Sequence, residues 1–529
     1  MPKSNGYWPI IYVRGYAMSR TEIDETTADP FCGFNLGSTV IRATPDPKTP
    51  PRKLIFESPI VRLQSDFEYC DVYEDGVDIG DPDFTADVKT SSIIIYRYYD
   101  SASTLFGTGK TPEITEFARG LSDLILRVKE LVCRNPENEV ATKDFKCYLV
   151  AHSMGGLVCR AFLQNAELGD QKARDCVDKY FTYATPHNGI DMAGINVPEF
   201  LGLNDINNFN RDQMAKYLNL GALYKKTQRV DWMPEEIFSS ERIFCMVGTN
   251  RGDYSVAGGL SRTFAGNGSD GLVRVANASV WGINAQGKFS EPSATAYCFR
   301  SHSGRYGIVN SEEAYQNLVR FLFGDVRVDL WADIQGVRVP QELEAQDTAG
   351  KVDALYQFEV LASPRGKRWY LTRRIAEEDS VACRDHSRLK KATVTAPERI
   401  YLSTVFLANR YKVNPKQRTL SYSMTFAVRV PDYEVDKKFW PDRHYEGGYL
   451  YRDTVVVELK VPTKTGADWQ VSYNWQSRDV AQATIPVSVQ KLKQGKVEID
   501  IPFATADETP PRSPGISGKL RFVIQLWNQ

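Results

Sequence analysis

The sequence predicts an α/β fold followed by an all-β domain, and two observations support this prediction. Short apolar runs rich in β-branched and aromatic residues alternate with helical patterns as far as Gly324; the runs are residues 10–13, 93–98, 147–150, 179–183 and 243–247. Alternation of strands with helices is typical of a mainly parallel sheet that is covered on both faces by helices. Beyond Gly324, apolar residues alternate with polar ones, as in antiparallel strands. We therefore predict two domains, residues 1–324 and 325–529.

Two helices of the first domain are predicted from the spacing of apolar residues. One apolar stripe, at steps of four, three and one, consists of Phe117, Leu121, Leu124, Ile125, Val128, Leu131 and Val132. A last helix has apolar residues at positions 315, 318, 319, 322 and 323, and Gly324 follows it in a position where helices commonly end. Residues 190–240 are partly apolar but have no strand pattern, so we expect a helical cap or lid there.

The second domain is predicted to be a β-sandwich. Apolar residues occupy every second position between Leu420 and Val430, and residues 454–461, 485–489, 497–501 and 520–527 have similar patterns. Turn-forming sequences such as KTGADW and KQGK separate these runs. Several short strands divided by turns in this way favour a sandwich of antiparallel sheets.

The composition is that of a globular protein. Of the 529 residues, 42% are hydrophobic and 25% are charged, which excludes a disordered or collagen-like chain. Lys and Arg number 65 against 66 Asp and Glu, so the formal net charge is -1. Such a chain has no overall field that would attract a polyanion, and we expect no nucleic acid as a partner.

Features that direct a chain to a membrane or out of the cell are not apparent. The chain opens MPKSNGYWPI without a long apolar stretch, and its apolar runs are far shorter than the roughly 18 residues of a spanning helix. Nine scattered cysteines without a CxxC pair suit reduced thiols. We expect a soluble, cytoplasmic protein, although export without a cleaved leader would leave the same sequence.

One segment carries the strongest chemical signal, CYLVAHSMGGLVCRAFL at residues 147–163. An apolar strand pattern ends at Ala151, Ser153 follows, and a helical pattern begins near Leu157. A serine at such a sharp strand-to-helix turn projects its hydroxyl beyond the sheet edge. The N–H group of Met154, the next residue, is positioned to bind a developing oxyanion.

This segment resembles the nucleophile elbow of the lipases and esterases in the α/β-hydrolase superfamily, usually G-x-S-x-G. Here it is A-x-S-x-G, because Ala151 replaces the first glycine, as in some lipases of that superfamily. The resemblance implies an α/β-hydrolase fold for the first domain and a nucleophilic Ser153.

Residues 7–19, YWPIIYVRGYAMS, are similar to the early strand and loop that supply the second oxyanion donor in lipases. The N–H of Tyr16 is the candidate donor, and Gly15 lets the backbone approach closely. Arg14 replaces the usual histidine. It is expected either to form a salt bridge or to meet an anionic group of the substrate.

The triad acid has two candidates. The segment NGSDGLVRV is similar to the D-G-x-V segment of bacterial lipases, which makes Asp270 the expected acid. Asp253, in VGTNRGDY, is the alternative acid. For either residue, binding a metal or closing a turn is the alternative to a role in the triad.

His302 is the expected base. In this fold the chain order is serine, acid, histidine, and His302 lies in a Ser/Gly-rich loop before the last helix of the first domain. His386 and His444 lie in charged stretches of the second domain and are expected to be solvated. His187, in the segment TPHNG, precedes any plausible acid, so the resemblance implies a supporting role for it.

These residues predict a serine carboxylic-ester hydrolase that forms an acyl-enzyme and requires no metal or other cofactor. Its expected substrate is an acyl glyceride, a phospholipid or a similar ester, with lipid-surface contact through the cap or the second domain as a further expectation. Two alternatives remain open at this stage: an amidase or acyltransferase with the same triad, and a non-catalytic binding protein of this fold.

Overall fold

The computed structural model describes residues 6–15, 38–42, 52–56, 58–72, 77, 79–98, 100, 103, 112–190, 209–252, 268–304, 306–412, 414–435, 443–462, 468–478, 484–505 and 513–528. The chain forms two compact units. The first contains residues 1–295 and 299–318, and the second contains residues 296–298 and 319–529. The division falls inside helix α10 (Glu312–Phe323), so this helix runs from one unit into the other.

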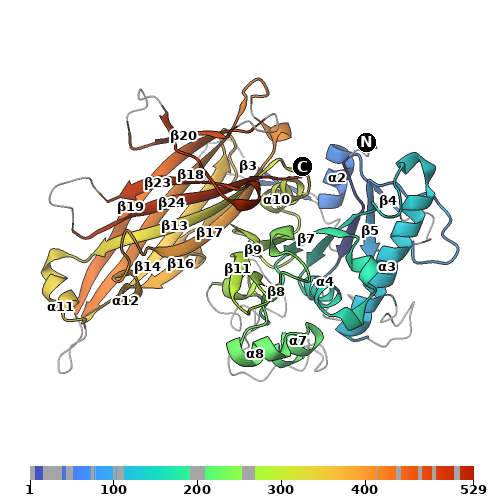
Figure 1. Cartoon of the computed structure of the whole chain (residues 1–529), viewed down its shortest axis with the longest axis horizontal. Coiled ribbons are helices and arrows are strands. Elements are labelled where there is room, and N and C mark those ends of the chain that lie inside the picture. The colour runs from blue at the N-terminus through green and yellow to red at the C-terminus, as the bar shows by residue number, and fades with distance from the viewer. Residues whose placement is uncertain are drawn as a thin grey trace. The chain divides into compact units, whose positions relative to one another are not determined.

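A seven-stranded sheet forms the centre of the first unit (Figure 1). Its strand order is β12-β9-β7-β6-β1-β5-β4, and the pairs from β9 to β4 are parallel. The strands are β1 (Ile10–Val13), β4 (Cys70–Asp71), β5 (Ser92–Tyr96), β6 (Cys147–His152), β7 (Val177–Tyr183), β9 (Ile243–Gly248) and β12 (Ala294–Cys298). Strands β1, β7 and β9 are almost wholly buried, because helices cover a parallel sheet.

Helices α2 (Pro59–Phe67), α3 (Ile114–Arg134) and α4 (Met154–Gln164) accompany this sheet (Figure 1). The predicted apolar stripe of α3 is buried except at Leu124, which is partly buried. Every residue of α4 is buried. Helix α4 follows β6 directly, so the packing of α4 fixes the turn between them.

The segment between β7 and β9 contains two short helices and one strand, and the strand was not predicted from the sequence. They are α7 (Arg211–Tyr217), α8 (Gly221–Thr227) and β8 (Trp232–Pro234). Strand β8 joins β10 (Trp281–Ile283) and β11 (Phe289–Pro292) in a separate small sheet. Met214, Leu218 and Met233 pack into the main core of the unit. Residues 191–208 of the expected cap lie outside the described residues.

The second unit consists of two antiparallel sheets that share one apolar core. One sheet has the order β17-β13-β24-β23-β22, and the other has β15-β14-β18-β19-β20-β21 with β16 paired to β14. The long strands are β13 (Val326–Arg338), β14 (Val352–Pro364), β17 (Glu398–Leu407), β18 (Thr419–Val435), β19 (Arg443–Lys460), β23 (Val497–Ala504) and β24 (Gly515–Leu526). The short strands are β15 (Thr372–Arg374), β16 (Ala382–Asp385), β20 (Gln470–Trp475), β21 (Ile485–Pro486) and β22 (Gln490–Lys491).

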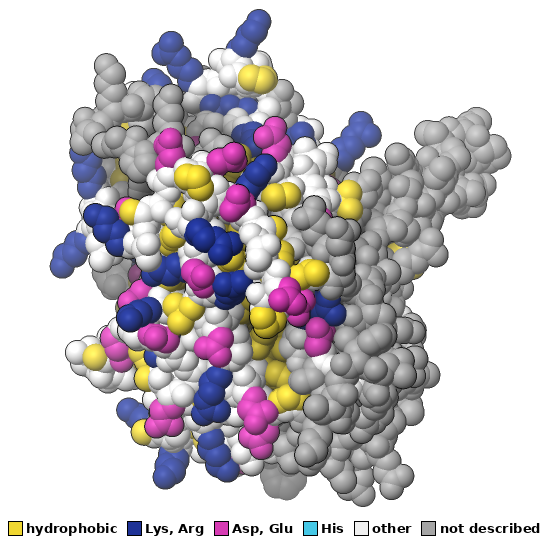
Figure 2. Space-filling model, turned by 90° about the vertical axis from the view of Figure 1, so that its right-hand side faces the viewer, with side chains coloured by type: hydrophobic (Ala, Val, Ile, Leu, Met, Phe, Trp, Pro, Cys, Tyr) yellow, Lys and Arg dark blue, Asp and Glu magenta, His cyan; other side chains and the backbone are white. Residues whose placement is uncertain are grey.

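The predicted fold class is confirmed. A parallel sheet flanked by helices, of α/β-hydrolase type, is followed by an antiparallel β-sandwich. Among the described residues, no helix combines the length and the apolar character needed to cross a membrane. On the face shown in Figure 2, basic and acidic side chains are interspersed.

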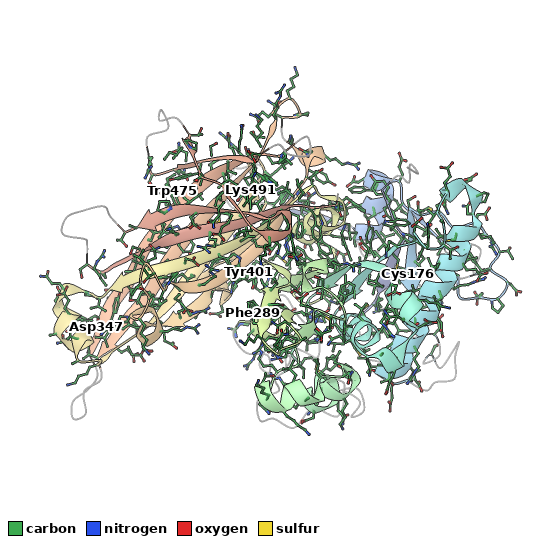
Figure 3. The ribbon with its side chains drawn as sticks, in the orientation of Figure 1. Cys176, Phe289, Asp347, Tyr401, Trp475 and Lys491 are labelled. Carbon is green, nitrogen blue, oxygen red and sulfur yellow. The ribbon has the colours of Figure 1, made fainter. Side chains whose placement is uncertain are left out.

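The expectation of a solvated His386 is wrong. His386 is 2% exposed, and its ring lies against Tyr356, whose hydroxyl is 3.2 Å from Nδ1. Its Nε2 is 2.8 Å from Oδ1 of Asp347, a residue of α11 (Glu344–Thr348) that is labelled in Figure 3. The polar partners stabilise the buried ring, which a charged sequence context did not reveal. The side chain of His444 lies outside the described residues.

Candidate active site

Ser153 lies at the turn between β6 and α4, and its backbone is strained. Its φ is 51° and its ψ is -125°, a left-handed conformation that is costly for a residue with a side chain. The N–H of Ser153 donates to the carbonyl oxygen of Tyr183 at 2.9 Å, and its own carbonyl accepts from the N–H of Gly156 at 3.0 Å. These bonds hold the serine in the sharp turn that the sequence predicted.

Glycine is required at both positions after Met154, because neighbouring atoms leave no room for a side chain there. A side chain at Gly155 would collide with the carbonyl oxygens of Val13 and Arg14, and one at Gly156 would collide with Thr185. The start of α4 therefore lies directly against the end of β1. This contact brings the serine turn and the loop after β1 together.

Asp270, His302 and Ser153 form a line of hydrogen bonds. His302 Nδ1 is 2.9 Å from Asp270 Oδ2, and His302 Nε2 is 2.9 Å from Ser153 Oγ. Asp270 Oδ1 also accepts from the N–H groups of Leu272 (3.0 Å) and Val273 (2.7 Å). Because a carboxylate only accepts, Nδ1 carries the proton of a neutral His302 and Nε2 faces the serine hydroxyl as an acceptor.

The loops that carry the acid and the histidine are tied to each other. The N–H of His302 donates to the carbonyl oxygen of Asp270 at 2.9 Å. Gly248, at the end of β9, leaves room for both loops, since a side chain there would meet the carbonyl oxygen of Arg300 and Cβ of Asp270. Arg300, two residues before His302, forms an ion pair with Glu313 at 3.1 Å. Residues far apart in sequence are thereby held at one place.

His152 contacts the same site, a role that motif reasoning did not assign. Its Nε2 is 2.8 Å from the carbonyl oxygen of His302, so Nε2 donates and carries the proton. The two imidazole rings are 5.0 Å apart. Burial, and next the repulsion that a protonated His302 would exert, lower the pKa of His152 to about 3, so this ring is neutral near pH 7. Its position beside the serine was the one available sequence signal.

The loop after β1 is held by Tyr98. The Tyr98 hydroxyl donates to the carbonyl oxygens of Arg14 (2.6 Å) and Gly15 (3.1 Å). Gly15 lies against His152 and Ser153, with no room for a side chain. Met154 is the first residue of α4, where N–H groups have no partner within the helix. Tyr16, the other candidate oxyanion donor, lies outside the described residues, as does Asp253, the alternative acid.

His187 is part of the core. Its Nε2 is 3.2 Å from Thr182 Oγ1, and burial lowers its pKa well below the ordinary value, with Arg160 as the second cause. Its carbonyl oxygen accepts from Arg160, a buried residue of α4 that also donates to the carbonyls of Val230 and Trp232 at 2.9 Å. Arg160 thus ties α4 to the segment before β8. The motif did not indicate this contact, because it joins residues about 70 positions apart.

Among the described residues, no three His, Cys, Asp or Glu side chains are grouped closely enough to hold a metal ion. The acid–histidine–serine line can perform one chemical step directly: an oriented imidazole can accept the proton of a serine hydroxyl.

No protein-family model matches the sequence, and no curated protein matches it either. Solved structures with a similar arrangement include the Bacillus licheniformis lipase BlEst2 in its propeptide form, with 12% identity, 89% of this chain and 96% of that chain covered, and a TM-score of 0.33. Its mature form has 14% identity, covers 60% and 92%, and has a TM-score of 0.32. Phospholipase PlaB from Legionella pneumophila, in complex with thio-NAD, has 11% identity, covers 90% and 91%, and has a TM-score of 0.30. At these identities and TM-scores, the function of this chain has to be argued from its own residues.

Proposed function

We propose that this protein is a serine carboxylic-ester hydrolase with Ser153 as nucleophile, His302 as base and Asp270 as the acid that orients the base. One observation carries this proposal: two hydrogen bonds of 2.9 Å join the three side chains in the order that serine catalysis needs. The strained backbone of Ser153 supports it further, because strain of this kind is common where a side chain is held for reaction.

In the proposed reaction, Ser153 Oγ attacks the carbonyl carbon of the ester while His302 Nε2 accepts the hydroxyl proton. The tetrahedral intermediate then collapses, and His302 returns the proton to the leaving alcohol. Water, deprotonated by His302, attacks the acyl-enzyme and releases the carboxylic acid. The Asp270 carboxylate stabilises the imidazolium at each stage.

The oxyanion of the intermediate is proposed to accept hydrogen bonds from the N–H groups of Met154 and Tyr16. A helix N-terminus favours negative charge, so the first N–H of α4 suits this role. Loss of one such donor costs roughly 3 to 4 kcal/mol of transition-state stabilisation in comparable sites. The bonds from Tyr98 that hold the loop after β1 support a fixed position for its backbone.

We propose acyl glycerides, phospholipids or similar esters as the substrate class, with contact to a lipid surface through residues 190–240 or the second domain. An amidase or acyltransferase would form the same acyl-enzyme and differ in the bond cleaved or in the acceptor. The leaving group therefore has to be identified by experiment.

The test is hydrolysis of p-nitrophenyl esters from acetate to palmitate, compared with the matching p-nitroanilides. We expect turnover of esters and a loss of about a thousandfold or more in Ser153→Ala. Ser472→Ala, which removes a hydroxyl from β20 in the second unit, is the matched control and should keep the wild-type rate. Retained turnover in folded Ser153→Ala would refute the proposal, and cleavage of anilides at the rate of esters would favour the amidase.

A further inference from the structure

Two loops of the second unit have an unusual charge. Residues 365–371 connect β14 to β15, and residues 408–418 connect β17 to β18. Together they contain seven basic residues: Arg365, Lys367, Arg368, Arg410, Lys412, Lys416 and Arg418. No acidic residue occurs between positions 360 and 376 or between 403 and 431. This local excess stands out in a chain whose formal net charge is -1.

The same two loops border a cavity of about 350 Å³. Arg320, Arg365 and Lys412 line it, together with the polar side chains of Asn414, Gln417, Thr419 and Ser421. Among the described residues that line this cavity, none is acidic. The cavity therefore combines three cationic side chains with neutral hydrogen-bonding groups.

Arg320 gives the cavity a fixed cation. This α10 residue is 2% exposed, and its guanidinium lies over the ring of Tyr411, 4.4 Å from the centroid, and 5.2 Å from the centroid of Trp369. Aromatic rings beside a guanidinium attract its positive charge and hold the cation in place. Such a group is suited to tetrahedral oxyanions, which accept two hydrogen bonds from it at once.

Nearby carboxylates balance only part of this charge. Arg365 pairs with Glu458 at 2.8 Å, but this pair is solvent-exposed and therefore weak. Lys412 Nζ donates to the backbone carbonyl of Gln417 at 3.2 Å, and no described carboxylate forms an ion pair with it. Within the part of the chain that the structure describes, no carboxylate forms an ion pair with Lys367, Arg368, Lys416 or Arg418. An anion entering the cavity would thus meet a positive field.

We propose that this cavity binds a phosphate group, carried either by a soluble phosphomonoester or by the head group of an anionic phospholipid. The cationic side chains oppose the negative charge of a phosphate, and the amide groups of Asn414 and Gln417 and the hydroxyl of Thr419 offer further donors to its oxygens. The site lies in the second unit and is independent of the ester hydrolysis proposed for the first.

The test uses the full-length protein, titrated calorimetrically with inorganic phosphate and with glycerol 3-phosphate in a phosphate-free buffer. Sedimentation with phosphatidylglycerol vesicles, compared with phosphatidylcholine vesicles, distinguishes the two sources of the phosphate. The variants are Arg320→Lys and the double variant Arg365→Gln/Lys412→Gln. Arg320 is buried, and its replacement can disturb folding. The double variant, at partly exposed loop positions, is therefore the decisive test of the proposal. Lys491→Gln is the matched control, since it removes an exposed cation elsewhere in the same unit (Figure 3).

We expect the double variant to bind at least about tenfold more weakly, Lys491→Gln to bind like the wild type, and added salt to weaken binding. Binding of both soluble anions with these losses supports the proposal. Binding to phosphatidylglycerol vesicles alone, with the same losses, also supports it and identifies the lipid as the source. No binding in either arm, or equal binding by the double variant and the wild type, would overturn it.

Discussion

At the scale of residues, the proposed mechanism depends on His302 having a single orientation. Four hydrogen bonds fix this residue: its two ring nitrogens bond Asp270 and Ser153, its N–H bonds the Asp270 carbonyl, and its carbonyl accepts from His152. Both its ring and its backbone are thus held by partners inside the site. A base held in this way needs no rearrangement before it accepts the serine proton.

His152 should make the protein less stable in acid. Its pKa is lowered to about 3 in the folded protein from an ordinary value of 6.5, so below pH 6.5 the unfolded chain binds a proton that the folded chain excludes. The free energy of unfolding is then lost as pH falls from 6.5 towards 3, by up to about 1.4 kcal/mol per pH unit. Urea unfolding of the wild type and of His152→Gln between pH 7 and 5 measures this loss.

We expect the two stability curves to converge as the pH falls, because glutamine does not titrate. Glutamine also retains a donor for the His302 carbonyl, so the variant should keep most ester turnover at pH 7. His187 is also buried and its pKa is also lowered. Because His187 is present in both proteins, its effect cancels in the difference between their free energies of unfolding. Parallel curves would show that His152 is protonated equally in both states.

The sequence indicated part of this site. Strand and helix patterns indicated the turn at Ser153, the resemblance to bacterial lipases selected Asp270, and the chain order of that fold selected His302. The structure brings the three side chains within hydrogen-bonding distance. Their catalytic roles stay a prediction. The contact of His152 with the His302 carbonyl could not be predicted, because it depends on how a loop 150 residues away folds back.

At the scale of elements, the turn from β6 to α4 depends on close backbone packing. The first turn of α4 lies against the carbonyl oxygens at the end of β1, with a hydrogen atom as the only side chain that fits at Gly155. The position of the serine turn relative to the loop after β1 follows from this contact.

Gly155→Ala should therefore destabilise the first unit by about 1 to 3 kcal/mol, the usual cost of forcing a methyl group into a packed site. It should also lower ester turnover, since the backbone of Ser153 must shift with α4. Thermal unfolding and p-nitrophenyl ester hydrolysis measure the two effects.

Gly221→Ala is the matched control for this substitution. Gly221 begins α8 with nothing within 4 Å of an added methyl group, so alanine should leave stability unchanged or raise it slightly. Equal stability and turnover in the two variants would contradict the packing argument.

The bounds of helices and strands with a clear apolar pattern were predicted to within a few residues. Strand β1 has the predicted bounds, and α3, with its apolar stripe, extends the predicted helix by a few residues at each end. Strand β8 was not predicted, because its three residues, WMP, are too few to show an alternation and they pair with the distant β10. Short strands of this kind are determined by their partners rather than by their own sequence.

At the scale of the whole molecule, the described residues form two separate apolar cores. One includes Leu121 of α3 and the central sheet, and the other includes Leu330 of β13 and the facing sheets of the second unit. The change in apolar period near residue 325 indicated this change of architecture.

Leu121→Ala and Leu330→Ala should each lower the free energy of unfolding of their own unit by about 2 to 5 kcal/mol, since both side chains are almost completely buried. Calorimetry of the full chain, with loss of ester turnover as the marker of the first unit, measures both transitions. If both variants lowered one common transition equally, the units would unfold as a single body.

The most direct measurement is covalent labelling with a fluorophosphonate, followed by mass spectrometry of the peptides. We predict one adduct, on Ser153, formed about a thousandfold or more slowly in His302→Ala and absent in Ser153→Ala. An adduct on another residue, or an unchanged labelling rate without the His302 imidazole, would contradict the proposal that Ser153 is the nucleophile and His302 its base.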